Sequence, residues 1–231
     1  MRRPDFIARQ SRCPTGLLGR LIGYIMSAET ATANEEALTR LDLQPSDRVL
    51  EVGFGHGRTI ERAATALATG FIAGIDLSEE MVRMAERRCR RLIHDGKVAL
   101  TVGDSVHLPF SDQHFDKALS VHTVYFWSDP LAHLREIRRV LRDGGRFVLA
   151  FRSKDDKMAD DFPDTVYRFY TGEDVASLLQ ESGFERVDLA TPRGGLVMAT
   201  AYRPPQSQLV SSCPIYPNPE TVPPPQSPNS K

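Results

Sequence analysis

The most informative stretch of this sequence is Leu50-Glu51-Val52-Gly53-Phe54-Gly55-His56-Gly57. An apolar run leads into three alternating glycines, and a helix is predicted from about Arg58 onward. Glycine lets the backbone turn sharply and approach a ligand without a Cβ in the way. We therefore expect a strand, a glycine-rich turn and a helix. The turn either binds a ligand or is only a tight connection.

Two nucleotide-binding motifs can be compared with this stretch. A phosphate-binding P-loop needs Lys followed by Ser or Thr after its last glycine, whereas Arg58 and Thr59 follow Gly57. A dinucleotide fingerprint needs a small residue at position 58 for close helix packing, so Arg58 disfavours NAD without excluding it. The turn suits a ligand with an amino-acid end, and Glu51 is a candidate anchor for its ammonium group.

Short apolar runs alternate with helical periodicity around this turn, which is typical of βαβ units. The predicted fold class is α/β, a Rossmann-like and mostly parallel sheet with helices on both faces. The seven expected strands are residues 48–52, 71–75, 98–102, 115–121, 145–151, 184–189 and 196–202. Helices are expected at residues 30–41 and 172–181. Helical spacing predicts two more, one with Val82, Ala85, Cys89 and Leu92 on its apolar face and one with Leu131, Leu134, Ile137 and Leu141.

Asp76 ends the second predicted strand, 23 residues beyond Gly53. An acidic side chain there can accept hydrogen bonds from both hydroxyls of a ribose. It can equally cap the helix that follows, and Ser78 competes for that role. The order and distance of glycine turn and acid favour the ribose.

Five segments in order now carry a resemblance to a known family. The sequence LEVGFGHG, GIDLS, GDSVHLPF, FDKALSVHTVYFW and LRDGGRFVLAF resembles class I S-adenosylmethionine-dependent methyltransferases over about residues 44–151 and, by strand count, on to 202. The resemblance implies a sheet whose last strand is antiparallel, and S-adenosyl-L-methionine as cofactor.

The resemblance also implies cofactor-binding residues. Gly53, Gly55 and Gly57 would border the methionine moiety, with Glu51 near its amino group and Asp76 on the ribose. The remaining implied cofactor-binding residues are Leu77 and Met81 against adenine, Asp104 and Ser105 at the adenine edge, and Ser120 at the end of the fourth strand. No metal site is expected.

Methyl transfer from a sulfonium needs mainly alignment and exclusion of water. An oxygen or acidic carbon acceptor also needs a base, and His122 is the first candidate because imidazole ionises near neutral pH. Tyr125 is a second, weaker catalytic candidate. The alternative is that both residues only line the pocket.

The acceptor is expected to be a small, apolar molecule such as a quinone, a lipid or a natural product, by analogy with the family. Residues 121–124 lack the pattern of adenine and amide methyltransferases, and 29 basic against 30 acidic residues disfavour nucleic acid. Alternatives are a cofactor-binding module or partner subunit without catalysis, and an NAD-dependent enzyme.

Composition favours a cytoplasmic protein with no membrane span. Its three cysteines show no CxxC spacing, and the longest apolar stretch near the N-terminus is interrupted by Arg20. The Arg-rich first 20 residues resemble a transit peptide superficially, but Pro4 and Pro14 favour an arm before a short helix. The oligomeric state stays open.

Three regions are expected along the chain. Residues 1–44 form an arm and a helical segment that is either a lid or a packing helix, and residues 45–202 form the cofactor-binding domain. Residues 203–231, with nine of the sixteen prolines, form a disordered tail.

Overall fold

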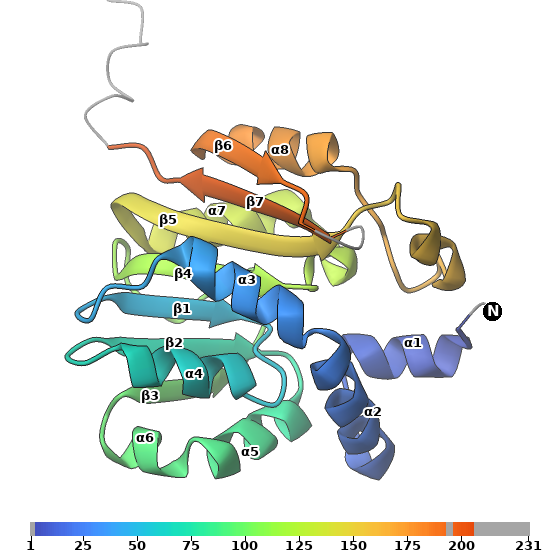
Figure 1. Ribbon diagram of the computed structural model, residues 1–231, viewed down its shortest axis with the longest axis horizontal. Helices are drawn as coiled ribbons and strands as arrows, with labels where there is room; N and C mark the ends of the chain where they lie inside the picture. Colours follow the sequence, from blue (N-terminus) through green and yellow to red (C-terminus); the bar gives the residue numbers. More distant parts are fainter. Residues whose placement is uncertain (1–2, 193–195, 206–231) are drawn as a thin grey trace, which may run out of the picture.

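A computed structural model describes residues 3–192 and 196–205 of the chain. The described strands form one sheet in the order β3-β2-β1-β4-β5-β7-β6 (Figure 1). Their bounds are β1 Arg48–Val52, β2 Phe71–Asp76, β3 Val98–Val102, β4 Phe115–Val121, β5 Leu141–Arg152, β6 Glu185–Ala190 and β7 Leu196–Tyr202. The strands β1 to β5 are parallel, and β7 runs antiparallel to both β5 and β6. The predicted fold class, including the antiparallel last strand, is confirmed.

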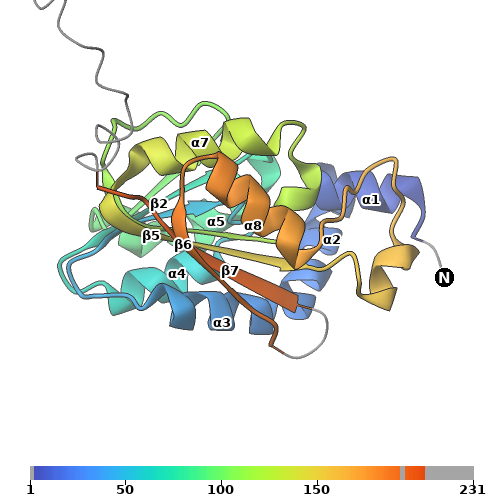
Figure 2. The same cartoon turned by 90° about the horizontal axis from the view of Figure 1, so that it is seen from above.

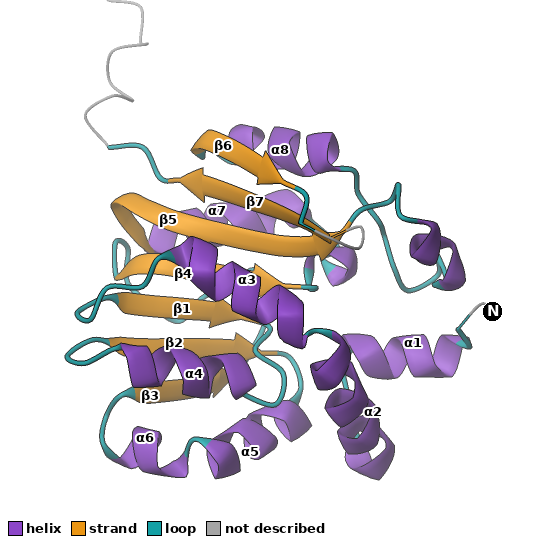
Figure 3. Ribbon diagram, viewed as in Figure 1, coloured by secondary structure: helices purple, strands orange, loops and turns teal. Residues whose placement is uncertain are grey.

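Helices cover both faces of the sheet (Figure 2). They are α1 Asp5–Arg12, α2 Gly16–Glu29, α3 Ala31–Leu41, α4 Arg58–Ala66, α5 Glu79–Arg88, α6 Arg90–His94, α7 Pro130–Val140 and α8 Gly172–Glu181, with short 3₁₀ turns at Val124–Phe126 and Lys157–Asp161. The alternation of strand and helix along the chain is visible in Figure 3.

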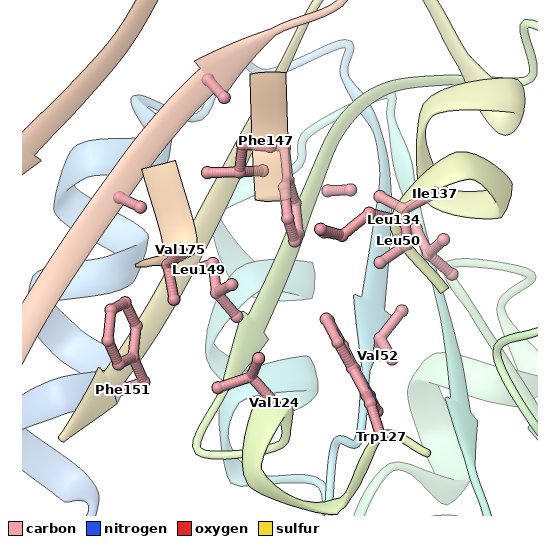
Figure 4. Close-up of a cluster of buried hydrophobic side chains, with 14 of the residues drawn as sticks. Leu50, Val52, Val124, Trp127, Leu134, Ile137, Phe147, Leu149, Phe151 and Val175 are labelled. Carbon is pink, nitrogen blue, oxygen red and sulfur yellow. The ribbon is translucent and has the colours of Figure 1, made fainter. Parts of the chain in front are cut away.

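Two apolar cores follow from the alternation of side chains along each strand. Leu50 and Val52 point into the core that α7 and α8 cover, which is drawn in Figure 4. Val49 points to the other face, into a core shared with α3, α4 and α5. Because both faces are covered, the central strands are buried and mostly apolar, as the apolar runs of the sequence predicted, with Glu51 and Lys117 as buried charged exceptions.

Several predicted boundaries differ from the structure. The helix predicted through Leu92 is two helices, because the backbone at Cys89 leaves the helical conformation with φ −94° and ψ 12°. Leu141 lies in β5 and not in the helix before it, and β5 passes an irregularity in register before the predicted start at Gly145.

The N-terminal segment is more ordered than expected. Pro4 and Pro14 do not prevent a helix but flank one, α1, with Pro4 at its N-cap, where a missing N–H costs nothing. At the other end Arg203 was predicted to begin the tail, yet its backbone pairs with Gly144 and Gly145. The rest of the predicted tail, from residue 206 on, lies outside the described residues.

In the described part of the chain, none of the helices combines the length and the hydropathy needed to cross a bilayer.

Candidate active site

A cavity lies at the carboxyl ends of the parallel strands. Figure 1 shows α1 and α2 beyond these ends of the sheet. About 180 Å³ of the cavity is open to the centres of water molecules, whereas the next cavity described offers about 10 Å³. One water needs about 10 to 15 Å³ by the same measure, so the cavity has room for a ligand much larger than a water. Residues after four different strands reach its wall, as expected for a ligand site in an open α/β sheet.

Glu51 is buried at the floor of this cavity, with 2% of its surface exposed. Its Oε2 atom has no hydrogen-bond partner among the described residues. Burial, and secondarily the negative charge of Asp76, raises the pKa of the Glu51 carboxyl to about 8. A buried carboxyl with an unused acceptor atom is suited to bind a cationic donor.

The glycine turn shapes the wall above Glu51. Gly53 and Gly55 line the cavity with φ values of +74° and +56°. A Cβ on Gly53 would lie 2.3 Å from Thr123 Cγ2, while one on Gly55 would have nothing within 4 Å. Gly57, also predicted to border the ligand, does not line the cavity and instead lets α4 pack on α5.

Asp76 connects the turn to the second strand. Its two carboxylate oxygens accept hydrogen bonds from the backbone N–H groups of Gly55, at 2.8 Å, and Ser78, at 2.9 Å. Ser78, not Asp76, caps α5 by accepting from Met81 N. Burial raises the pKa of Asp76, and the two N–H donors partly offset this. The carboxylate lines the cavity with lone pairs left for further donors.

Leu77 and Met81 line the side of the cavity next to Asp76. Leu77 is 45% exposed, whereas Met81 is buried under α2, where a Cβ on Gly23 would lie 2.9 Å from Met81 Cε. Gly23 and Met26 of α2 also line the cavity. The N-terminal helices therefore form part of the cavity wall. The sequence predicted this segment as either a lid or a packing helix.

Asp104 and Ser105 line the cavity after β3. The Ser105 hydroxyl bonds to His133 Nδ1 at 2.7 Å, and the His133 ring stacks on Trp127 with centroids 4.9 Å apart. His133 and Trp127 line the cavity too. His133 was not a predicted site residue, because from the sequence it is only one residue of an amphipathic helix.

Ser120 does not reach the cavity wall. It is fully buried, and its hydroxyl bonds to the carbonyl of Val52 at 2.9 Å and to the Thr123 hydroxyl at 2.5 Å. Thr123 is the residue that lies against Gly53. Ser120 thus contacts the glycine turn indirectly, through its hydrogen bond to Thr123. The spacing of residues in the sequence does not show this bond.

His122 lines the cavity just after β4, but Tyr125 does not. Tyr125 is buried, and its hydroxyl bonds to His122 Nδ1 at 2.9 Å and accepts from the backbone N–H of Arg152. Burial, and secondarily the charge of Arg152, lowers the pKa of His122 to about 4. The imidazole is therefore neutral at neutral pH.

The described residues contain no group of three His, Cys, Asp or Glu side chains placed to hold a metal ion.

Comparisons with known proteins agree with this geometry. A family model described as "Methyltransferase domain" matches residues 50–149. The uncharacterized methyltransferase YdaC of Bacillus subtilis is 30% identical over 73% of this chain and 88% of its own. The 27-O-demethylrifamycin SV methyltransferase of Amycolatopsis mediterranei is 35% identical over 52% of this chain and 47% of its own. The crystal structure of a methyltransferase from Aquifex aeolicus has a TM-score of 0.64 at 23% identity, over 73% of this chain and 88% of its own.

Proposed function

This chain belongs to the class I S-adenosylmethionine-dependent methyltransferases, whose cofactor is S-adenosyl-L-methionine, and we propose that it methylates a small, mainly apolar molecule. The apolar and aromatic part of the cavity wall, formed by Met26, Val121, Phe126 and Trp127, supports an acceptor of this kind. The rifamycin methyltransferase among the relatives also supports it. By its name, that relative acts on 27-O-demethylrifamycin SV.

The residues around the cavity fit the cofactor. The unpartnered Oε2 of Glu51 would accept from the amino group, and that ammonium would favour the ionised carboxylate. Gly55 leaves open space in which the methionine end would lie against bare backbone. The unused Oε2 of Glu51 is the single observation that carries the assignment, because a buried carboxyl is costly without a partner.

Further cofactor contacts are proposed from the placement of predicted residues. Asp76, free of a capping role, would accept from the ribose hydroxyls. Leu77 and Met81 would pack on adenine, and Asp104 with Ser105 would lie at its edge. Gly57 and Ser120 would act indirectly, by fixing the turn.

The chain's own contribution to the reaction would be alignment and exclusion of water. The cofactor supplies an activated methyl group on its sulfonium when bound. The glycine turn and Asp76 would hold one reactant in place, while α2 closes the side of the cavity where Gly23 and Met26 lie. Alignment of the reactants can by itself raise a reaction rate by many orders of magnitude, without a covalent bond between substrate and protein.

One experiment separates a methyltransferase from a module that only binds the cofactor. The protein is incubated with methyl-labelled S-adenosylmethionine and a cell extract, and labelled products are identified by mass spectrometry. We expect a labelled small molecule. Cofactor binding without any labelled product would contradict catalysis and favour the partner-subunit alternative. The expected cytoplasmic location and the absence of nucleic-acid partners stay predictions.

Asp76→Ala tests the cofactor assignment. Loss of hydrogen bonds to a polar ligand should weaken binding by about 1.5 to 3 kcal/mol, or about 10- to 150-fold in Kd, measured by calorimetry. Asp95→Ala is the control, because Asp95 caps the end of α6 outside the cavity wall. Equal affinities of both variants would contradict a role of Asp76 in binding.

A further inference from the structure

The side chain of His122 is held in the cavity wall by an uncommon backbone conformation. His122 has φ +57°, in the left-handed region that residues with a Cβ rarely adopt. Its backbone N–H donates to the carbonyl of Ala150 at 2.8 Å, which attaches this turn to β5. Such a conformation costs free energy and points to a function for the side chain that it directs.

A chain of hydrogen bonds determines which nitrogen of His122 carries the hydrogen. The backbone N–H of Arg152 donates to the Tyr125 hydroxyl oxygen. Burial raises the pKa of Tyr125, so the phenol keeps its own hydrogen. In the described part of the chain, the only acceptor within reach of that hydrogen is His122 Nδ1, at 2.9 Å. A buried hydroxyl hydrogen without an acceptor is costly, so Tyr125 donates to Nδ1.

This arrangement leaves the imidazole hydrogen on Nε2. A neutral imidazole has one donor and one acceptor nitrogen, and Nδ1 is here the acceptor. Nε2 makes no hydrogen bond within the described residues, yet it is not among their fully buried, unpartnered atoms. Since His122 lines the cavity, its Nε2–H is open to a molecule bound there.

We propose that His122 Nε2–H donates a hydrogen bond to the methyl acceptor, that Tyr125 is the positioning residue for this donor, and that the site takes acceptors with an oxygen that receives this bond. The proposal rests on the proposed function. It replaces the predicted role of His122 as a base, because the accessible nitrogen already carries a hydrogen. An oxygen nucleophile would thus enter as phenolate, enolate or carboxylate, already ionised.

The electrostatic surroundings agree with a donor. Burial disfavours a positive charge on the His122 imidazole and lowers its pKa, and the nearby charge of Arg152 on β5 acts in the same direction. A second positive charge on the imidazole would therefore be disfavoured in this buried place.

Nitrogen-15 NMR of the full-length protein without cofactor tests the donor directly. Long-range couplings show which ring nitrogen is protonated, and His122→Gln assigns the signals. We expect Nδ1 unprotonated, Nε2 protonated and no titration between about pH 5 and 8. A hydrogen on Nδ1, or titration in that range, would overturn the proposal.

Tyr125→Phe tests the positioning role. Without the phenol donor, His122 should no longer be confined to one tautomer, whereas Tyr202→Phe at the end of β7 should leave its signals unchanged. Unchanged His122 signals in Tyr125→Phe would exclude Tyr125 as the positioning residue. If Tyr125→Phe does not fold, the wild-type spectrum alone decides the tautomer.

The acceptor class is tested with a matched pair of probes. 4-Nitrophenolate should shift the Nε2–H resonance in the presence of S-adenosylhomocysteine, whereas 4-nitroanisole, its neutral methyl ether, should shift it much less. Equal effects of the two probes, or none, would contradict a site for an acceptor oxygen. The tautomer spectra are recorded without cofactor, so absence of cofactor binding would overturn the proposed function and leave the tautomer result standing.

Discussion

At the scale of single residues, Glu51 shows how burial changes the ionisation of a carboxyl group. Its carboxyl is removed from water and lies near Asp76, so its pKa rises from an ordinary value of 4.5 to about 8. Between these pH values the folded protein holds a proton that the unfolded chain has lost. The stability that this proton contributes is therefore full below pH 4.5 and is lost as the pH rises through about 8.

Glu51→Gln should remove this pH dependence. The free energy of unfolding of the variant minus that of the wild type should increase with pH between 4.5 and 8 and then level off. The slope should not exceed about 1.4 kcal/mol per pH unit. Urea unfolding at several pH values measures it. A difference that does not change with pH would show that Glu51 ionises normally in the folded state.

The sequence predicted the cavity-lining residues that lie at or just after the end of a strand. Glu51, Gly53 and Asp76 all line the cavity, because the carboxyl ends of parallel strands meet at one edge. Ser120 and Tyr125 were also predicted as site residues, but neither lines the cavity. Their roles depend on hydrogen bonds to Val52 and Arg152 on other strands, which no local pattern shows.

At the scale of elements, the glycine turn contributes to the packing of two helices. Gly57 precedes α4 with φ +82°, and a Cβ there would lie 2.6 Å from Ala85 Cβ and 3.0 Å from Ala85 Cα on α5. The backbone of α5 cannot move easily away from such a contact. Glycine at this position therefore sets the distance between α4 and α5, next to the cavity.

Gly57→Ala should destabilise the protein by about 2 to 4 kcal/mol, from the strained φ and from the contact with Ala85. Gly96→Ala is the matched control, because Gly96 also has a positive φ, +71°, but nothing lies within 4 Å of its Cβ position. We expect about 1 to 2 kcal/mol for Gly96→Ala in urea unfolding. Equal losses would mean that backbone strain alone explains the glycine at position 57.

Elements were predictable where the pattern was long and uniform. Four of the seven predicted strands, β1, β3, β4 and β7, have the predicted bounds, and in β1, β4 and β7 most residues are buried, which makes the apolar run easy to delimit. The break at Cys89 was missed because the apolar spacing continues through it to Leu92. The helix α1 was missed because Pro4 and Pro14 were interpreted as interruptions, whereas they lie just outside its ends.

At the scale of the whole molecule, the last strand is fixed by a residue beyond it. Arg203 donates from Nη1 to the carbonyls of Arg138, Arg139 and Leu141, and its backbone pairs with Gly145. These contacts join the end of β7 to the junction of α7 and β5. We therefore place the end of the folded domain after Arg203, and not at Tyr202 as the sequence suggested.

A pair of truncations tests this boundary. A chain ending at Pro205 should keep the wild-type free energy of unfolding. A chain ending at Tyr202 should lose about 2 to 4 kcal/mol, because the charged hydrogen bonds of Arg203 are removed. Thermal and urea unfolding measure both. Equal stability of the two truncated proteins would show that Arg203 contributes little, and a loss in the longer one would show that residues 206–231 contribute to stability.

The most direct measurement is isothermal titration of the full-length protein with S-adenosylmethionine, followed by displacement with S-adenosylhomocysteine. We predict one cofactor bound per chain, competition between the two ligands, and weaker binding by Asp76→Ala than by Asp95→Ala. Absence of binding to the folded wild-type protein, or binding that S-adenosylhomocysteine does not displace, would contradict a cofactor site at the carboxyl ends of these strands.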